Sequence, residues 1–339
     1  MNSKAYWIGL DVHKKYWTVC ILDEYNTPTH FDITCGDYVS ETVNRLISKI
    51  NQLDIKGDFN SVYEAGPWGF APHGELNKAG FYNTIVAPHN VPKSSKDLKW
   101  KNDKNDAYNL AYFLMHGRLE SIYIPLEEEV HLKTLVKTRR TLVNERTRIK
   151  VFIKQRAMGF GININSSISL KRATLLLREI EKLECFNPCM KDSIKRWEKL
   201  NNQIINLESR IDNYLKSINY QHLYVKLLEI QGVSQFLAAD LIAYYGNVSR
   251  FPTFNAFKSY SGLVPYQAQS GAVNNLILGK KDYKRPTVRS TYNNAAKSLI
   301  QHNPKYKLKY QQYKSTNPKN AFIKVQQAFA KEIYPLWQC

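Results

Sequence analysis

The first ninety residues alternate short apolar runs with stretches of helical spacing. Runs rich in strand-forming residues cover Tyr6–Val12 and Tyr16–Leu22, and a third run, Thr29–Thr34, follows a group of turn residues. These three runs predict an antiparallel meander. Apolar residues three or four positions apart over Glu41–Leu53 then predict the first helix.

The next elements alternate strand and helix. Ser61–Glu64 reads as a strand that breaks at Gly66-Pro67, Trp68–Ala79 as a helix, and Tyr82–Ala87 as a fifth strand. A further helix is expected to begin near Ala107. The order β-β-β-α-β-α-β-α predicts a mixed sheet with helices on its faces, which is the order of an RNase H-like fold.

The middle of the chain predicts long helices. Leucine or isoleucine recurs every seven residues at Leu135, Leu142 and Ile149 within the helical stretch Val130–Arg156. After a break at 159–167, helical spacing resumes over Leu170–Leu183 and Ile194–Leu215. We expect the long helices to pack as an antiparallel coiled-coil pair, which could also dimerise.

The last third combines a helical hairpin with a basic tail. Leu227–Phe251, with Gly232-Val233-Ser234 at its turn, resembles a helix-hairpin-helix, whose glycine lets backbone N–H groups approach a phosphate. A plain αα-hairpin explains the same pattern. In the tail, Gln301–Lys319, tyrosines alternate with lysines, and they could stack on bases or cover the core.

Composition changes this picture through charge. The 339 residues suggest about two domains, and the net charge of +19 favours a polyanionic partner, most often nucleic acid. No run is apolar enough for a transmembrane helix, and the N-terminus lacks the features of a signal peptide. The five scattered cysteines are best interpreted as free thiols. We therefore expect a cytoplasmic, nucleoid-associated protein without membrane contact.

The helix Val130–Arg156 concentrates this charge. Nine basic residues face one acidic residue, Glu145, so the helix repels itself unless phosphates cover it. Nucleic-acid contact is therefore predicted for eight of these nine residues: Lys133, Lys137, Arg139, Arg140, Arg146, Arg148, Lys150 and Lys154. Arg139 and Arg146 fall on the heptad spacing, so they could instead pair with a neighbouring helix.

Four carboxylates occupy positions where active sites of α/β sheets gather. Asp11 and Glu64 end predicted strands, and Asp103 and Asp106 lie three residues apart at the start of a helix that Asn102 could cap. Convergent carboxylates repel one another unless cations lie between them, and their hard oxygens suit Mg²⁺ or Mn²⁺. Two such ions stabilise attacking and leaving oxygens in phosphoryl transfer.

Three motifs carry a resemblance that covers nearly the whole chain. GLDVHKK around Asp11, YEAGPWG around Glu64 and KNDKNDA with Asp103 and Asp106 resemble the acidic motifs of the DEDD insertion-sequence transposases. That family has a RuvC-like domain and includes the Piv-type DNA invertases. The resemblance implies that the four carboxylates form a metal-binding tetrad. His13 is interpreted as a turn histidine without a metal role.

A C-terminal motif extends the resemblance. GLVPYQAQSG at 262–271 is similar to the family's transposase motif, in which a serine before glycine attacks a DNA phosphodiester and forms a phosphoserine link. Only Ser270 can fill that role here, since the chain has Gln269 where family members commonly have a second serine. Ser261 is interpreted as structural. Basic residues expected to contact nucleic acid follow at Lys280, Lys281, Arg285 and Arg289.

Together these predictions describe a three-part DNA recombinase. A RuvC-like metal-binding domain would cover 1–125, a helical nucleic-acid-binding and dimerisation arm 126–222, and a mainly α transposase domain 223–339. The resemblance implies donor and target duplex DNA as substrates, a structured non-coding guide RNA, and a homodimer or tetramer. The alternatives are a Mg²⁺-dependent junction nuclease, a Piv-like invertase without guide RNA, or a non-catalytic nucleic-acid-binding protein.

Overall fold

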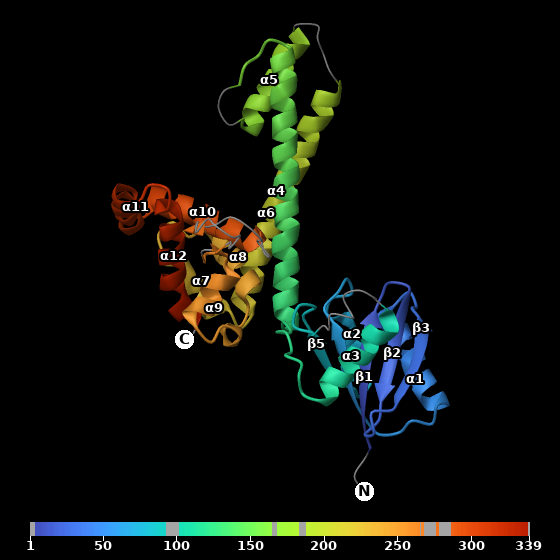
Figure 1. Cartoon of the computed structure of the whole chain (residues 1–339). Coiled ribbons are helices and arrows are strands. Elements are labelled where there is room, and N and C mark those ends of the chain that lie inside the picture. Colours follow the sequence, from blue (N-terminus) through green and yellow to red (C-terminus); the bar gives the residue numbers. More distant parts are fainter. Residues whose placement is uncertain are drawn as a thin grey trace. The chain divides into compact units, whose positions relative to one another are not determined.

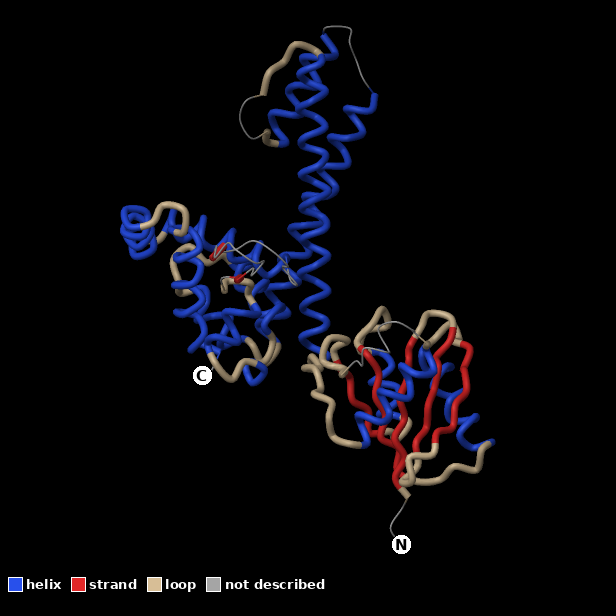
Figure 2. The backbone as a smooth tube through the Cα atoms, viewed as in Figure 1, coloured by secondary structure: helices blue, strands red, loops and turns tan. Residues whose placement is uncertain are grey.

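The chain forms two compact units, Met1–Ile124 and Pro125–Cys339. The computed structural model describes residues 4–92, 102–164, 168–182, 188–264, 266–267, 276–277 and 286–337 (Figures 1 and 2). Every described helix is too short or too polar to cross a membrane.

A five-stranded mixed sheet organises the N-terminal unit. Its strands are β1 (Ala5–Val12), β2 (Tyr16–Leu22), β3 (Pro28–Thr34), β4 (Asp58–Glu64) and β5 (Tyr82–Val86). They lie in the order β3-β2-β1-β4-β5, with β1, β2 and β3 antiparallel and β1, β4 and β5 parallel. The predicted meander and the predicted mixed sheet are confirmed.

Helices cover both faces of this sheet because the strands alternate apolar residues toward each face. The helices are α1 (Val39–Gln52), α2 (Ala71–Lys78) and α3 (Asp103–Met115). Ile8 and Leu10 of β1 pack in one cluster with Leu46 of α1 and Leu76 of α2. On the opposite face, Val62 of β4 and other strand residues pack against α3. The element order agrees with the sequence prediction.

Two long helices run through the second unit side by side (Figure 1). They are α4 (Glu127–Gly159) and α6 (Pro188–Ser217), and α5 (Leu170–Lys182) packs on α6. Cross-helix contacts join Arg139 to Glu208 and Arg146 to Asn201, so residue numbers rise along α4 as they fall along α6. The predicted antiparallel pair is confirmed. It is longer than predicted at both helices.

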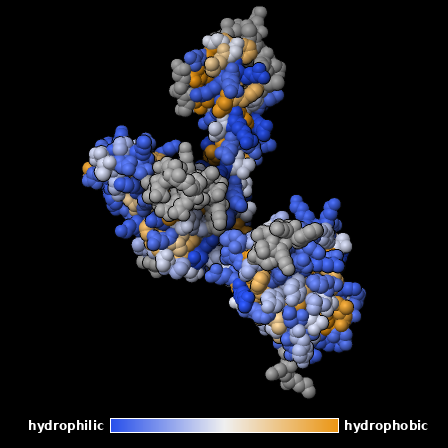
Figure 3. Space-filling model, viewed as in Figure 1, coloured by the Kyte–Doolittle hydropathy of each residue, from blue (hydrophilic) through white to orange (hydrophobic). Residues whose placement is uncertain are grey.

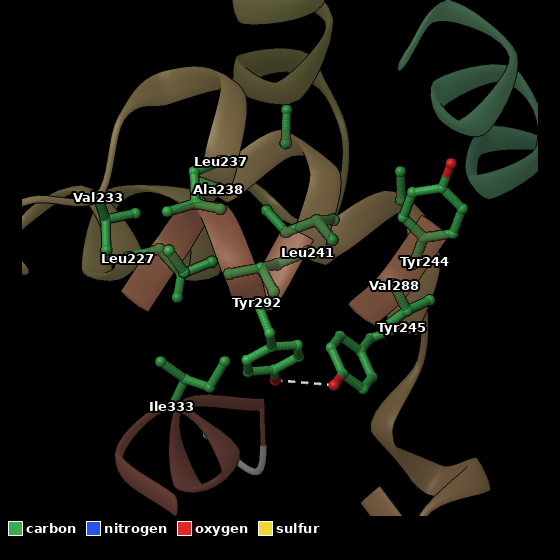
Figure 4. Packing of buried hydrophobic residues seen from close by; sticks show 14 of the residues in the cluster. Leu227, Val233, Leu237, Ala238, Leu241, Tyr244, Tyr245, Val288, Tyr292 and Ile333 are labelled. Carbon is green, nitrogen blue, oxygen red and sulfur yellow. Dashed lines mark hydrogen bonds between the residues drawn. The ribbon is translucent and has the colours of Figure 1, made fainter. Parts of the chain in front are cut away.

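The remaining helices build the main apolar core of this unit. They are α7 (Gln221–Leu228), α8 (Gln235–Tyr245), α9 (Phe254–Tyr260), α10 (Pro286–His302), α11 (Pro304–Thr316) and α12 (Ala321–Ile333). Short 3₁₀ turns lie at Val248–Arg250 and Tyr334–Trp337, and β6 (Tyr266–Gln267) pairs with β7 (Leu276–Ile277). In the core, the buried hydroxyls of Tyr245 and Tyr292 are 2.7 Å apart (Figure 4).

The predicted hairpin joins α7 to α8. Ser234 caps α8 by accepting a hydrogen bond from the Leu237 N–H at 3.2 Å. Gly232 has φ +98°, and a Cβ there would lie 3.2 Å from the Cα of Leu299 in α10. Packing on α10 therefore requires glycine at this turn even without a phosphate, which supports the plain αα-hairpin interpretation.

Candidate functional site

Asp11 and Glu64 lie at one edge of the sheet. In the parallel pair β1–β4, Leu10 is opposite Tyr63, so Asp11 and Glu64 follow at neighbouring positions where both strands end. Leu10 and Tyr63 point into the cluster with α1 and α2. Because side chains alternate along a strand, Asp11 and Glu64 belong to the opposite face, which α3 covers.

Gly9 brings α3 against this face. A Cβ at Gly9 would lie 1.9 Å from the carbonyl oxygen of Ala107 and 2.6 Å from the N–H nitrogen of Ala111, so only glycine allows this approach. The first turn of α3 therefore lies beside Asp11, two residues further along β1. The cap predicted for this helix is confirmed, since the Asn102 side chain accepts from the Lys104 N–H at 3.0 Å.

Asp11, His13 and Asp103 meet at this edge. Their ligand atoms all lie within 4.8 Å of one another, a grouping that could hold a metal ion. His13 Nε2 is 3.0 Å from Asp11 Oδ2 and 3.6 Å from Asp103 Oδ2. The side chains are 21%, 38% and 35% exposed in the order Asp11, His13, Asp103, so the group is accessible to solvent.

The hairpin between β1 and β2 holds this group in place. The Tyr16 hydroxyl donates to Asp103 Oδ2 at 2.9 Å, which joins β2 to α3. The backbone of His13 donates to the Tyr16 carbonyl at 3.1 Å and accepts from Trp68 Nε1 at 3.0 Å. Trp68 belongs to the YEAGPWG motif, so the first two motifs contact each other directly.

The pKa of Asp11 is raised by its surroundings. Burial raises the pKa of Asp11, nearby charge on Asp103 and Asp106 raises it further, and His13 acts in the opposite direction. The hydrogen bond to Asp103 is the main cause that raises the pKa of Tyr16. The charges of two further predicted carboxylates therefore act on Asp11.

The other two predicted carboxylates lie outside the 4.8 Å group. Asp106 is one turn further along α3, close enough for its charge to act on Asp11. Glu64 is half-buried at the end of β4 and takes part in contacts of its own. Sequence reasoning missed the placement of His13 and Tyr16 beside the carboxylates. Their position within two to five residues of Asp11, across a tight hairpin, is the signal that could have found them.

Several basic residues of α4 face inward. Arg139 Nε donates to Glu208 at 2.8 Å, and its guanidinium carbon lies 3.6 Å from the centre of the Phe236 ring. Arg146 donates to the Asn201 side chain at 3.1 Å. Arg139 and Arg146 therefore pair across a helix partner, as their heptad spacing allowed.

Arg140 takes part in a buried network. Its Nη2 donates to the carboxylate of Asp240, which is 4% exposed, and to the Thr291 hydroxyl at 3.3 Å. Thr291 donates in turn to Asp240 Oδ2 at 2.8 Å. Burial raises the pKa of Asp240, and the Arg140 charge opposes that shift. Asp240 thus offsets one charge that the sequence of α4 leaves unbalanced.

The other basic residues of α4 that were predicted to contact nucleic acid differ in exposure. Lys133 and Lys150 are half-buried against aromatic rings, 5.8 Å from the Tyr244 centre and 5.0 Å from the Trp197 centre. Lys137 and Arg148 are exposed on α4, and Lys154 is half-buried.

The predicted nucleophile Ser270 lies outside the described residues, as do Lys280, Lys281 and Arg285. Arg289 is described and donates to the Gly262 carbonyl at 3.2 Å. Ser261 is 1% exposed; its hydroxyl contacts the Tyr245 hydroxyl and donates to the Phe257 carbonyl at 2.7 Å. These contacts agree with a structural role for Ser261.

Comparisons with known proteins agree with the motifs. An IS110-type DEDD family model described as "Transposase" matches residues 8–156, and a model described as "Transposase IS116/IS110/IS902 family" matches residues 225–311. The chain is 24% identical over 212 residues to the candidate transposase y4qE of Sinorhizobium fredii, a match that covers 62% of this chain and 50% of that protein. It is 21% identical over 300 residues to the transposase for insertion sequence element IS1111A of Coxiella burnetii, which covers 87% and 78% respectively.

The chain therefore spans half of the length of one relative and about three quarters of the other. Membership of a DEDD family suggests use of a divalent metal, and the group around Asp11 offers the acidic cluster that such use needs. From the two family models and the relatives, we conclude that the chain belongs to the IS110/IS116/IS902 family of transposases.

Proposed function

We propose that this chain is a DNA recombinase that cleaves and exchanges strands through a phosphoserine at Ser270, with divalent ions held by Asp11, Glu64, Asp103 and Asp106. The observation that carries the proposal is the approach of Asp11 and Asp103 at the sheet edge, with Asp106 near enough to act on Asp11. Carboxylates without such a task repel one another at a cost in stability.

The proposal includes a three-part organisation of the chain. Residues 1–125 form an RNase H-like, RuvC-like domain, an assignment that the strand order β3-β2-β1-β4-β5 supports. Residues 126–222 form the helical arm that binds nucleic acid and dimerises, and residues 223–339 form the transposase domain. Within the last part, the turn at Gly232 is helix-hairpin-helix-like and packs on α10.

The ligand chemistry fits Mg²⁺ or Mn²⁺. Both ions prefer hard oxygen donors, and the carboxylates supply them at one accessible edge. When bound, two such ions supply charge neutralisation at the phosphate that reacts. The chain's own residues hold the carboxylates ready: His13 orients Asp11, and Tyr16 orients Asp103 by hydrogen bonding.

In the proposed reaction, each phosphoester bond that breaks is replaced by a new phosphoester bond. The Ser270 oxygen forms a bond to phosphorus, the bond from phosphorus to one sugar oxygen breaks, and the proton of the serine hydroxyl passes to the departing sugar oxygen. A sugar hydroxyl of a second DNA end then forms a bond to the same phosphorus, the bond from phosphorus to the serine oxygen breaks, and the hydroxyl proton passes to that serine oxygen. No water or external energy source enters, so strands are exchanged rather than hydrolysed.

Nucleic acid binds mainly through exposed basic residues of the arm, which include Lys137 and Arg148 of α4. Donor and target duplex DNA are the proposed substrates, and a structured non-coding RNA is the proposed guide. Base pairing to such an RNA would leave the protein to read backbone and shape. Exchange between two duplexes requires a dimer or tetramer. The proposed location is the cytoplasm, at the nucleoid.

A covalent-adduct assay tests the mechanism. Incubation with end-labelled junction DNA and Mg²⁺ should give a protein–DNA adduct with the wild type and none with Ser270→Ala, whereas Ser259→Ala, an exposed serine, should behave as wild type. Asp11→Asn should abolish both adduct and cleavage, with Asp37→Asn as the matched exposed control. Cleavage without an adduct in Ser270→Ala would identify a junction nuclease instead.

Co-purification tests the guide RNA. The protein is isolated from cells that carry its native flanking DNA, and the bound RNA is sequenced. One discrete RNA encoded beside the gene supports guided recombination. Absence of a discrete RNA, together with adduct formation, would favour a Piv-like invertase.

A further inference from the structure

A groove with a volume of about 740 Å³ lies in the C-terminal unit, between α9, α11 and α12. Each helix contributes residues from one face, because positions four or seven apart share a face of a helix. The residues used below are Phe254 and Lys258 of α9, Lys309 and Tyr313 of α11, and Lys324 and Lys331 of α12. None of them belongs to the carboxylate site.

The groove is strongly basic and lacks counter-charge. Its four lysines form no ion pair within the part of the chain that the structure describes. The single carboxylate in the lining, Glu332, is already engaged by Lys305 at 2.5 Å and by the Tyr306 hydroxyl at 2.9 Å. Four ammonium groups around one groove repel one another unless an anion enters it.

This environment differs from that of α4. There Arg139 and Arg140 form ion pairs with Glu208 and Asp240, so acidic residues of the protein already offset their charge. The groove lysines keep their charge available to a ligand. The surface over α11 is largely hydrophilic (Figure 3).

Aromatic rings line the same groove. Lys324 lies 5.6 Å from the centre of the Tyr313 ring, and Lys258 lies 5.9 Å from the centre of the Phe254 ring. These cation–π contacts hold the ammonium groups at the wall of the groove. The Tyr313 hydroxyl has no hydrogen-bond partner among the described residues, so it is free to donate to a phosphate. Tyr313 is half-buried and packs against the edge of the main core, whereas Tyr306 is fully buried within it.

We propose that this groove binds a single-stranded segment of nucleic acid, with phosphates on the lysines and a base against Tyr313. Unpaired lysines that follow a backbone, combined with rings that can stack on bases, are the two parts of a single-strand site. A duplex keeps its bases stacked internally and would use only the lysines. The groove is separate from the carboxylates, so this proposal does not depend on the recombination chemistry.

Paired lysine substitutions in the full-length protein test the charge. Lys309→Gln with Lys324→Gln removes two groove charges, and Lys307→Gln with Lys314→Gln removes two exposed charges of α11 outside the groove. Binding to a fluorescent 20-nucleotide single strand is measured by anisotropy across a salt series. Each lost phosphate contact should reduce the slope of log affinity against log salt concentration by about 0.7. Because two contacts are lost, the groove pair should bind roughly 25-fold more weakly than the wild type at 0.1 M salt. The control pair should change affinity less than threefold.

Tyr313 tests the stacking. Tyr313→Leu keeps apolar bulk but removes the ring and should weaken single-strand binding about tenfold, whereas Tyr313→Phe keeps the ring and should stay within a few fold of wild type. Neither should alter binding to a matched 20-base-pair duplex. Circular dichroism and thermal melting of each variant check that folding is retained.

Crosslinking supplies an independent measurement. A single strand that carries 5-iodouracil is irradiated with the wild-type protein, and the crosslinked peptide is identified by mass spectrometry. The proposal predicts a crosslink at Tyr313 in both RNA and DNA versions of the strand. Equal losses for the groove and control pairs, or an equal loss on duplex and single strand in Tyr313→Leu, would overturn it. Because Asp11→Asn should leave this binding unchanged, failure here is distinguishable from failure of the recombinase proposal.

Discussion

Asp11 and Asp240 show two different uses of a carboxylate in one chain. Asp240 is buried, and its Oδ2 accepts from Arg140 and Thr291 of two other helices, so this carboxylate links α4, α8 and α10. Asp11 is partly exposed and lies near two further carboxylates, and His13 offsets part of their effect. Partners and exposure, rather than residue type, separate the structural carboxylate from the proposed catalytic one.

The largest expected effect tests the structural side of this comparison. Arg140→Ala should lower the free energy of unfolding by about 3–5 kcal/mol, because it leaves Asp240 charged and unpaired in the core. Urea unfolding of the full chain, followed by circular dichroism, measures the change.

The charge-free pair provides the control. Arg140→Met combined with Asp240→Leu should recover most of the loss, since apolar residues of similar volume often replace a buried ion pair without cost. If Arg140→Ala alone costs less than 1 kcal/mol, the network is not structural, and Arg140 returns to the set of nucleic-acid contacts.

The next effect tests how the proposed site is positioned. Gly9→Ala should destabilise the protein by about 1–3 kcal/mol, because the new methyl group overlaps the Ala107 carbonyl and pushes α3 away. Gly74→Ala is the control, since its helical position has open space and should gain about 0.5–1 kcal/mol. Mn²⁺ affinity, measured by calorimetry, should fall in Gly9→Ala and not in Gly74→Ala.

Gly9 also shows what the sequence could and could not reveal. Alternation of apolar residues predicted the strands around it and the element order, because local spacing encodes both. That Gly9 serves helix packing requires knowing that α3, a hundred residues later, lies on its face of the sheet. The same limit applies to His13: its motif was visible, but its contact with Asp103 depends on the tertiary fold.

The basic helix α4 shows a second limit of prediction from sequence, which concerns surface charge. Charge counting along α4 found one opposing acid, because the sequence window excluded Glu208 and Asp240, which lie far along the chain. Only the heptad spacing of Arg139 and Arg146 hinted at pairing. Long-range ion pairs are set by packing, so a run of like charge in sequence overstates the surface charge that remains.

A smaller effect on stability is expected at Asp212, a third carboxylate with two hydrogen-bond partners. Asp212 accepts from Lys216 at 2.5 Å and from the Tyr224 hydroxyl at 2.8 Å, and these partners lower its pKa, with Lys216 as the main cause. Its stabilisation is therefore present above its ordinary pKa of 3.8 and is lost as pH falls through the lower folded value. Asp212→Asn should cost about 1 kcal/mol at pH 7. The difference from wild type should shrink below about pH 4, and a constant difference down to pH 3 would contradict this assignment.

The smallest effect has the opposite sign and returns to Asp11. Its pKa is raised, first by burial and then by Asp103 and Asp106, so the charged form costs stability. That cost is absent below the ordinary pKa of 3.8 and grows as pH rises through the higher folded value. In EDTA, Asp11→Asn should therefore raise the free energy of unfolding by about 0.5 kcal/mol at pH 7, the scale of one like-charge contact, and should match wild type near pH 4. Urea midpoints at both pH values measure the difference. A loss of stability in Asp11→Asn would mean that neighbouring residues hold Asp11 as a structural carboxylate, and that its charge is not available for a ligand.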